Sequence, residues 1–586
     1  MTVGLAPGLN AATILALFFQ QQHQLAHLSV IDIAVIAVYF VMVIWIGFYL
    51  KQRANTSEEF FMAGREMTAW IAGLSFVSAN LGSLELMGWA GSAYQYGILA
   101  THWYWIGAIP AMLFLGLVMM PFYYVSKTHS VPGYLKLRFG ESSRVLAGVS
   151  FAFMTILMSG VNMFSMAVVM KVVLGWDITF SILMSSIAVA VYVVLGGLRS
   201  AIFNEVLQFV LIWGGALLIP ILGLVEAGGF TGLKTQILHN MAGQDYTHLW
   251  RGMGSFTGNP MGIHWTGIVF GLGFVISFGY WTTDFLVVQR VLSANSLRSA
   301  QMAPIIGSVF KMAVPFIVIL PGLLGLVVLK NADGSLMHLV GENAVSAANP
   351  HSYNEVLPLM LVRYCGPGLL GLGVTALIAG FMSGMAGNVT AFSAVWTYDI
   401  YQPLIKKNAP DSHYVAVGRW ATILGVLVSI GTAYLVMHAA GIMDYVQALF
   451  SFFIAPLLGT ILLGMFWKRA TAAGGFWGLL AGTGVSVGLF AWVKLDPEAL
   501  SRVAFSIHAK AMAEDMYRAL WSFATCALVT VIVSYMTKPK TVTELQGLVY
   551  GQTAIPHEGP VPFYKNHWFW AGVVFVGFIV LNVIFW

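Results

Sequence analysis

Charged side chains are scarce in this chain. Asp, Glu, Lys and Arg make up 9 % of its 586 residues, whereas apolar side chains make up 59 %. A soluble domain carries about 25 % charged residues, so a chain this long with so little charge could not cover its own surface in water. The composition excludes a soluble enzyme, a nucleic-acid-binding domain and a disordered scaffold. It indicates a polytopic protein whose partner is the lipid bilayer.

Cysteine is almost as rare. The two cysteines, Cys365 and Cys526, lie in apolar stretches and form neither a disulfide framework nor a zinc or haem spacing. The H-E-x-x-H motif of zinc hydrolases and the G-x-x-x-x-G-K-S/T motif of phosphate-binding loops are both absent. We therefore expect a protein that is not an enzyme, has no organic cofactor, and needs neither nucleic acid nor an obligate protein partner.

Long apolar runs fill most of the chain. A membrane-spanning helix needs about 20 apolar residues. This criterion predicts fourteen spans, at 30–51, 68–97, 101–126, 143–174, 178–195, 199–227, 262–291, 303–329, 361–400, 413–437, 441–466, 473–494, 515–536 and 566–586. The runs are continuous and do not alternate, so the predicted fold class is all-α.

Basic residues gather in alternate loops, whereas the two longest central loops, 228–261 and 330–360, are poorer in them. Because Lys and Arg accumulate in cytoplasmic loops, we predict a plasma (inner) membrane protein with both termini outside the cytoplasm. The first 29 residues hold no Lys or Arg, so we interpret them as a short, uncleaved extension. The basic residues on the predicted cytoplasmic side are Lys51, Arg53, Arg65, Lys127, Lys136, Arg138, Arg144, Arg199, Arg290, Arg298, Lys406, Lys407, Arg419, Lys468, Arg469, Lys538 and Lys540.

Two spans contain small and polar residues that interrupt the helical pattern. They are residues 75–83 (SFVSANLGS) in the second span and residues 270–280 (FGLGFVISFGY) in the seventh. Five spans separate them, and interrupted segments at matching positions are typical of an inverted-repeat transporter. Unwound backbone is tolerated in a membrane only where it lines a cavity or is buried in protein. The alternative is that these residues only let helices pack closely.

Ionisable residues within the spans are candidates for binding. Each costs about 2.5–3.5 kcal/mol on insertion scales, so each needs a function or a partner. Glu85 and Lys311 favour a binding site, whereas Glu205 and Asp284 suit a binding or a structural role equally well. Three residues near span ends are expected to extend to the headgroups instead: Asp32, Arg290 and Arg363.

Aromatic residues adjoin the second interrupted segment. Tyr280 ends it and Trp281 follows. Aromatic rings at such a position can stack on the apolar face of a sugar, while tyrosine hydroxyls and amides bind its hydroxyl groups. Simple helix packing is the alternative.

The same regions carry a series of distinctive blocks. They are residues 60–67 (FFMAGREM), 78–83 (SANLGS), 88–91 (GWAG), 196–199 (GGLR), 204–208 (NEVLQ), 280–284 (YWTTD), 288–292 (VQRVL), 399–401 (DIY), 444–447 (DYVQ), 466–469 (FWKR) and 474–478 (GGFWG). In this order, with Lys311 at the expected distance, they resemble the sodium/solute symporter family, and in particular its sodium–glucose cotransporter branch. The resemblance covers nearly the whole chain.

The resemblance implies a leucine-transporter-like fold, in which ten core helices form two inverted repeats of five. Residues 1–586 would be one transporter domain, with a peripheral helix at 30–51, repeats at 68–227 and 262–466, and peripheral C-terminal helices at 473–586. It further implies a secondary active transporter that imports a monosaccharide, such as glucose or galactose, together with sodium by alternating access.

Carried over by position, the resemblance implies a sugar site. Its residues would be Asn80, Glu85, Tyr280, Trp281, Lys311 and Gln447, with Tyr280 also acting as the inward gate. Glu85 stands where relatives carry His or Gln, and Tyr104 stands where sugar-transporting relatives have a glutamate. An acidic group has therefore moved between helices, so Tyr104 joins the predicted site and the identity of the sugar stays open.

The resemblance also implies a sodium site. It would use the backbone carbonyls of Ser78, Leu81 and Gly380 and adjacent hydroxyls at positions 383 and 384. Here Ser383 is followed by Gly384, so one hydroxyl is missing unless Ser78 or a water replaces it. Sodium remains the predicted coupling ion, and Glu205 stands where the family has an aspartate near the sodium exit.

Several functions remain open at this point. The missing hydroxyl leaves room for coupling to protons and for a sodium-independent sugar facilitator or sensor. The exchange at Glu85 and Tyr104 leaves room for a symporter of another polar solute, such as an inositol, sialic acid or an amino acid.

Overall fold

The computed structural model describes residues 28–50, 56–126, 128, 130–241, 244–331, 333–553, 559 and 561–586, with the side chains of 188–197 excepted. The described residues form helices and three isolated bridges, with no extended strand among them. The fold class is all-α, as predicted. Most of the predicted N-terminal extension, together with Lys51, Arg53 and Lys127, lies outside the described residues.

The first half of the chain builds the helices up to the first long loop. They are α2 (Val30–Leu50), α3 (Ser57–Met62), α4 (Ala69–Asn80), α5 (Ser83–Tyr96), π-helical turns at Trp103–Ala108 and Leu115–Met119 on either side of α6 (Ile109–Phe114), α7 (Met120–Ser126), α8 (Val131–Phe139), α9 (Glu141–Leu174), α10 (Ile178–Ala216), α11 (Leu218–Ala227) and α12 (Gly229–Asn240).

The second half follows. It contains a π-helical segment (Gly267–Ser277), α13 (Phe278–Thr283), α14 (Phe285–Leu292), α15 (Leu297–Ala313), α16 (Pro315–Val318), α17 (Leu320–Val328), α18 (Val356–Tyr364), α19 (Leu369–Val395), α20 (Gln402–Leu404), α21 (Asp411–Ala433), α22 (Ile442–Leu449), a π-helical turn (Phe450–Ile454), α23 (Ala455–Phe466), α24 (Ala472–Leu495), α25 (Leu500–Val503), α26 (Ala511–Met536) and α27 (His567–Ile584).

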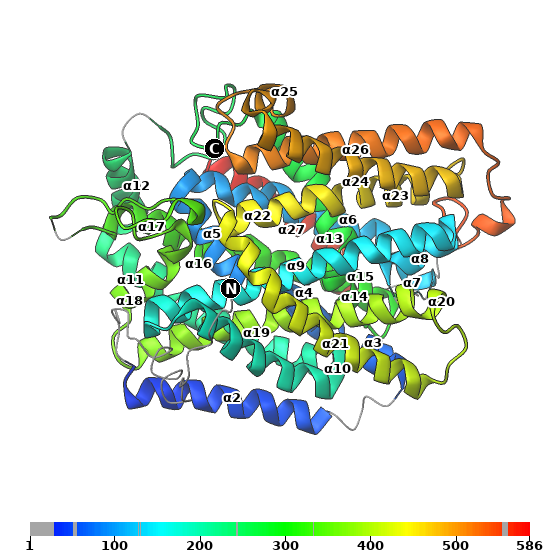
Figure 1. Cartoon of the computed structure of the whole chain (residues 1–586), viewed down its shortest axis with the longest axis horizontal. Coiled ribbons are helices and arrows are strands. Elements are labelled where there is room, and N and C mark those ends of the chain that lie inside the picture. The colour runs from blue at the N-terminus through cyan, green and yellow to red at the C-terminus, as the bar shows by residue number, and fades with distance from the viewer. Residues whose placement is uncertain are drawn as a thin grey trace, which may run out of the picture.

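Long helices cross the molecule from one end to the other. Helices α12, α17 and α18 lie at one end, and α3, α8 and α20 lie at the opposite end (Figure 1). Among the described residues, ten helices are long and apolar enough to span a membrane, and three pairs bent by more than 40° bring the number to thirteen. We predicted fourteen spans.

The difference lies at the predicted spans 178–195 and 199–227. Leu198–Ala227 is long and apolar enough to be a span on its own. In the first predicted span the described side chains end at Ile187, so Ile178–Ile187 counts only as a shorter apolar helix. Arg199 lies 2.9 Å from Glu66, beside α3, whereas Gly215 faces Leu372 near the start of α19. A count of thirteen among the described residues therefore does not contradict the fourteen predicted spans.

The first predicted helix break is confirmed. Helix α4 ends at Asn80, α5 begins at Ser83, and the two axes differ by 56°. Leu81 N donates to Ser78 O and Val77 O, each at 3.0 Å. Gly82 opens α5 without a side-chain cap. Glycine at this position has no side chain that could cap the first N–H groups of α5, which lack partners within the helix.

The second predicted break is in the wrong place. Residues 267–283 are helical through the glycines, and the chain bends by 48° at Asp284. A Cβ on Gly271 would collide with Met516 O, and one on Gly273 would lie 3.0 Å from Ile106 Cγ2. These glycines therefore serve close helix packing. Asp284 is extended at the bend, where its Oδ1 accepts a bond of 2.9 Å from Leu286 N and caps α14.

The predicted span at 361–400 also divides. Helix α18 ends at Tyr364 and α19 begins at Leu369. Asp32 Oδ1 accepts hydrogen bonds from Gly368 N at 2.8 Å and Gly371 N at 2.5 Å. Asp32 is fully buried, so the prediction that it extends to the headgroups is wrong. Its carboxylate joins α2 to the start of α19, where helix N–H groups favour negative charge.

Candidate functional site

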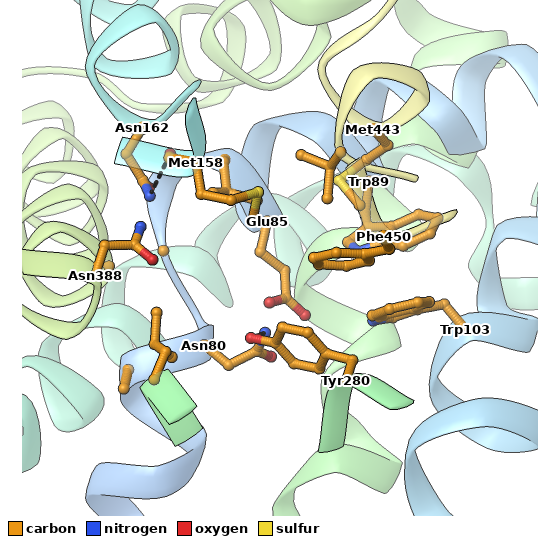
Figure 2. Close-up of a pocket in the computed structure, with 16 residues that line it drawn as sticks. Asn80, Glu85, Trp89, Trp103, Met158, Asn162, Tyr280, Asn388, Met443 and Phe450 are labelled. Carbon is orange, nitrogen blue, oxygen red and sulfur yellow. Dashed lines mark hydrogen bonds between the residues drawn. The ribbon is translucent and has the colours of Figure 1, made fainter. Parts of the chain in front are cut away.

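A small cavity lies beside the break between α4 and α5. Its volume is about 20 Å³, which is room for about one water molecule and far below the 300–1,000 Å³ of a typical ligand pocket. The lining residues come from α4, α5, the π-helical turn at Trp103–Ala108, α9, α13, α14, α19 and the α22 region (Figure 2). They include Asn80, Glu85, Trp89, Trp103, Met158, Asn162, Tyr280, Asn388, Met443 and Phe450.

Four polar side chains form one cluster at this cavity, in which Glu85, Tyr104 and Lys311 are buried and Asn80 is half-buried. Lys311 Nζ donates to Glu85 Oε1 at 3.0 Å and also to Asn80 Oδ1. Tyr104 OH donates to Glu85 Oε1 at 2.7 Å. The cluster thus joins the end of α4, the start of α5, the π-helical turn at Trp103–Ala108 and α15.

The Glu85–Lys311 ion pair is almost completely shielded from solvent. The Lys311 side chain is 0 % exposed and that of Glu85 is 2 % exposed. Removing one partner of such a pair costs about 3–5 kcal/mol because an uncompensated charge stays buried. Each charge has a further polar partner, since Lys311 bonds to Asn80 and Glu85 accepts from Tyr104, and these bonds offset part of the cost of burial.

Aromatic rings surround this cluster. Lys311 Nζ lies 5.2 Å from the Tyr104 ring centroid and 5.1 Å from that of Trp281. Tyr280 accepts a hydrogen bond of 2.7 Å from Asn80 Nδ2. Its ring centroid lies 5.0 Å from that of Phe450 and 5.1 Å from that of Trp281. Rings and hydrogen-bonding groups thus face the same small volume.

Gln447 differs from the other predicted substrate residues. It is fully buried on α22, and neither its Nε2 nor its Oε1 has a hydrogen-bond partner among the described residues. Met443 and Val446 of the same helix line the cavity. Six of the seven predicted residues are joined by hydrogen bonds or ring contacts, and Gln447 makes none of these contacts with them.

The predicted sodium ligands lie at the end of α4, with Leu81 directly after it, and on α19. Ser383 Oγ donates to Ser78 O at 2.8 Å and lies 3.1 Å from Ser78 Oγ. A Cβ on Gly380 would lie 3.3 Å from Leu81 O. The end of α4 and the middle of α19 are therefore in direct contact, with Gly384 one residue beyond Ser383. In the described residues no group of three or more His, Cys, Asp or Glu could hold a metal, so a cation here would depend on carbonyl, hydroxyl and amide oxygens.

Glu205, the predicted ion-exit residue, forms a second buried ion pair. Arg290 Nη2 lies 2.6 Å from Glu205 Oε1, and both side chains are 0 % exposed. Ser75 Oγ also donates to this carboxylate. Arg290 further donates to Leu286 O at 2.8 Å. The prediction that Arg290 extends to the headgroups is wrong because its guanidinium is held inside the bundle.

The sequence analysis missed the two asparagines of the cavity wall. Asn162 lies in the middle of α9 and Asn388 lies on α19, one turn after Gly384. Both are buried. Neither asparagine is ionisable or lies in an interrupted segment, but an amide within an apolar helix is also a polar group that needs a partner.

Comparisons with known proteins show the family and the fold of this chain. The family model described as Sodium:solute symporter family matches residues 60–482. The chain is 30 % identical over 538 residues to the human sodium/glucose cotransporter 4, across 89 % of this chain and 78 % of that protein. It is 28 % identical over 575 residues to the human sodium/myo-inositol cotransporter, across 91 % of this chain and 78 % of that protein.

A solved structure has the same fold. The substrate-bound, outward-open state of a Na⁺-coupled sialic acid symporter matches with a TM-score of 0.68 and 21 % identity, across 87 % of this chain and 99 % of that one. This confirms the predicted leucine-transporter-like fold. The chain therefore belongs to the sodium:solute symporter family and is a multi-pass membrane transporter, not an enzyme.

Proposed function

We propose that this protein imports a monosaccharide together with sodium by alternating access. The observation that carries the proposal is the hydrogen-bonded cluster of Asn80, Glu85, Tyr104 and Lys311, which lies beside aromatic rings at a helix break. A sugar presents hydroxyl groups that both donate and accept hydrogen bonds, and its ring has an apolar face. The cluster offers both partners to hydroxyl groups, and Tyr280 and Trp281 offer faces for stacking.

Gln447 supports the same class of solute. A buried amide without a partner costs about 1–3 kcal/mol, and both polar atoms of Gln447 lack one among the described residues. A solute hydroxyl group can bond to the amide oxygen and nitrogen together. We therefore include Gln447 in the substrate site with Asn80, Glu85, Tyr104, Tyr280, Trp281 and Lys311.

A polyol such as myo-inositol is the second candidate. The two human relatives described above carry glucose and myo-inositol in their names. Both solutes are rings of hydroxyl groups without net charge, which suits a cluster in which Glu85 and Lys311 balance each other. An anionic solute such as a sialic acid would need an additional unpaired cation.

Alternating access requires the site to open. With a volume of about 20 Å³, the cavity is too small for a sugar in this conformation. Tyr280 is our proposed inward gate, because its hydroxyl is tied to Asn80 on α4 and its ring packs on Phe450. Release toward the cytoplasm would break that hydrogen bond and turn the ring away.

Sodium is our proposed coupling ion. It would bind where α4 ends, between the carbonyls of Ser78, Leu81 and Gly380 and the hydroxyl of Ser383, beside Gly384. Half-helix ends and unwound carbonyls are typical sodium ligands in transporters of this architecture. Glu205 would help to guide the ion out, with Arg290 balancing its charge while the path is closed.

We further propose the plasma (inner) membrane, with both termini outside the cytoplasm. In support, α3, α8 and α20 lie at one end of the bundle (Figure 1), and α8 carries Lys136 and Arg138. Arg65, Lys136 and Arg138 belong to that end. Clusters of this kind mark the cytoplasmic side.

The test is uptake of radiolabelled glucose, galactose and myo-inositol into proteoliposomes. An inward sodium gradient is compared with a potassium gradient of the same size. Accumulation above equilibrium only with sodium is expected for one of these solutes. Equal equilibration under both gradients would make the protein a facilitator. Absence of uptake for all three would overturn the assignment to sugars and polyols.

A further inference from the structure

The space beside Gly384 is occupied by a side chain from another helix. A Cβ on Gly384 would lie 2.8 Å from Asn162 Oδ1, 3.2 Å from Asn162 Nδ2 and 3.2 Å from Gly82 Cα. Real Cβ atoms are not found within 3.0 Å of another heavy atom, so a serine at 384 and the present position of Asn162 exclude each other. The place of a side-chain oxygen at 384 is therefore taken by an amide oxygen from α9.

The side-chain oxygen of Asn162 makes only a long hydrogen bond at this position. Its Nδ2 donates to Met158 O at 3.3 Å, within α9. Its Oδ1 accepts from Ser83 Oγ at 3.4 Å, which is a long bond for an O–H donor. Figure 2 shows Asn162 and Asn388 on the cavity wall away from Trp103. An amide oxygen has two lone pairs, so Oδ1 retains capacity for a further ligand.

Oxygens from three helices converge at this point. A Cβ on Gly82 would lie 2.9 Å from Asn162 Oδ1 and 3.6 Å from Gly380 O. Leu81 O and Ser78 O belong to the same break, and Ser383 Oγ lies 2.8 Å from Ser78 O. Hard cations take oxygen ligands from carboxylates, carbonyls, amides and hydroxyls. An amide oxygen at this position completes such a set without adding charge.

We propose that Asn162 Oδ1 is a sodium ligand of this chain and supplies from α9 the oxygen that Gly384 lacks. This inference rests on the proposed sodium coupling. It explains why glycine occurs at both 82 and 384, since each lies against the Asn162 amide. It also means that a bound sodium ion would join α9 to the α4–α5 break and α19, so that three helices respond to the ion.

The experiment measures binding of ²²Na⁺ to the purified full-length protein by a scintillation proximity assay, without solute. Asn162→Ala is expected to raise the sodium dissociation constant about tenfold. Asn162→Ala combined with Gly384→Ser is expected to restore it to within about threefold of the unaltered protein, because the vacated space accepts the hydroxyl. Gly384→Ser alone is expected to bind sodium more weakly, since Asn162 is displaced. The matched control is Ser165→Ala on the same helix, whose hydroxyl donates to Val161 O at 2.8 Å, and it is expected to leave binding unchanged.

A second pair of variants covers the case in which Asn162→Ala does not fold. Asn162→Asp keeps an oxygen at the same place and is expected to bind sodium at least as tightly. Asn162→Leu has nearly the same volume without the oxygen and is expected to lose about tenfold. Thermal melting with and without sodium gives an independent measure, because an ion that binds only the folded state raises the melting temperature.

The outcomes separate the inference from the proposed function. If the unaltered protein shows no saturable ²²Na⁺ binding, sodium coupling itself fails. If it binds sodium and both Asn162→Ala and Asn162→Leu bind equally well, Asn162 is no ligand and the symporter proposal stands. If Asn162→Ala is weak and the Gly384→Ser combination does not rescue it, the loss comes from packing, and the inference is overturned.

Discussion

The two helix breaks lie at comparable positions in the two halves of the chain but differ in chemistry. At the α4–α5 break no side chain caps α5, and the carbonyl of Ser78 accepts a bond from Ser383 on α19. At the α13–α14 break, Asp284 caps α14 from within its own segment. Arg290 of α14 is paired with Glu205. At the first break a side chain from another helix bonds to the carbonyl of Ser78. At the second break the cap comes from the broken segment itself, and Tyr123 OH adds a bond of 3.0 Å to Thr282 O.

This difference indicates that the corresponding breaks of the two repeats have different roles. A break whose polar groups are satisfied locally can act as a structural bend. Where the polar groups of a break bond to other helices, the stability of the break changes when those helices move or a ligand binds. We therefore expect variants at the first break to affect binding and variants at the second to affect stability.

The largest effect is expected at Lys311, beside the first break. Lys311→Ala leaves Glu85 buried without its cation and should abolish solute uptake and lower the free energy of unfolding by about 3–5 kcal/mol. Uptake in proteoliposomes and thermal melting in detergent measure the two effects. The combination Glu85→Gln with Lys311→Met is the control, and it should recover stability but not uptake. Normal uptake by Lys311→Ala would contradict the site.

The next effect concerns the ion. Ser383→Ala removes the hydroxyl that bonds to Ser78 O, and the sodium concentration for half-maximal uptake should rise about tenfold, equivalent to about 1.4 kcal/mol. Solute affinity at saturating sodium should stay nearly unchanged. Uptake measured at a series of sodium concentrations gives the half-maximal value for each variant. An unchanged sodium dependence would mean that the ion binds elsewhere.

A smaller effect is expected at the second break. Asp284→Ala removes the cap of α14 and should lower the free energy of unfolding by about 1 kcal/mol, within the 0.5–2 kcal/mol range of such caps. Sodium and solute affinities should change little. Asp284→Asn is the matched control because it keeps a capping oxygen. A large change in solute affinity with intact stability would give this break a binding role and remove the contrast.

The smallest effect is expected at the residue that connects the two regions. Tyr280→Phe removes the hydrogen bond from Asn80 on α4 to α13 but keeps the ring against Phe450. One hydrogen bond contributes about 0.5–1.5 kcal/mol, so solute efflux should become about two- to tenfold faster while half-saturation for uptake changes less. Tyr280→Ala also removes the ring, and its solute efflux should be faster than that of Tyr280→Phe. Slower efflux in Tyr280→Phe would argue against a gate.

The local sequence predicted the position of the first break correctly and that of the second break wrongly. At residues 78–83, small and polar residues interrupt an apolar run, and the structure bends there. At residues 270–280 the same kind of pattern is helical, because Gly271 and Gly273 face Met516 and Ile106 on other helices. Glycine in a membrane helix permits both a break and a close contact, and only the packed neighbour distinguishes them.

The sequence by itself determined the membrane class, the all-helical fold, the family and the first break, because apolar runs and motif blocks are local properties of the chain. Tertiary structure alone decided which polar groups meet. Asp32 caps a helix 336 residues away, and Arg290 pairs with Glu205 across 85 residues. Asn162 fills the space at Gly384 from another helix. A buried polar group must find a partner wherever the fold places one, and no local pattern records that choice.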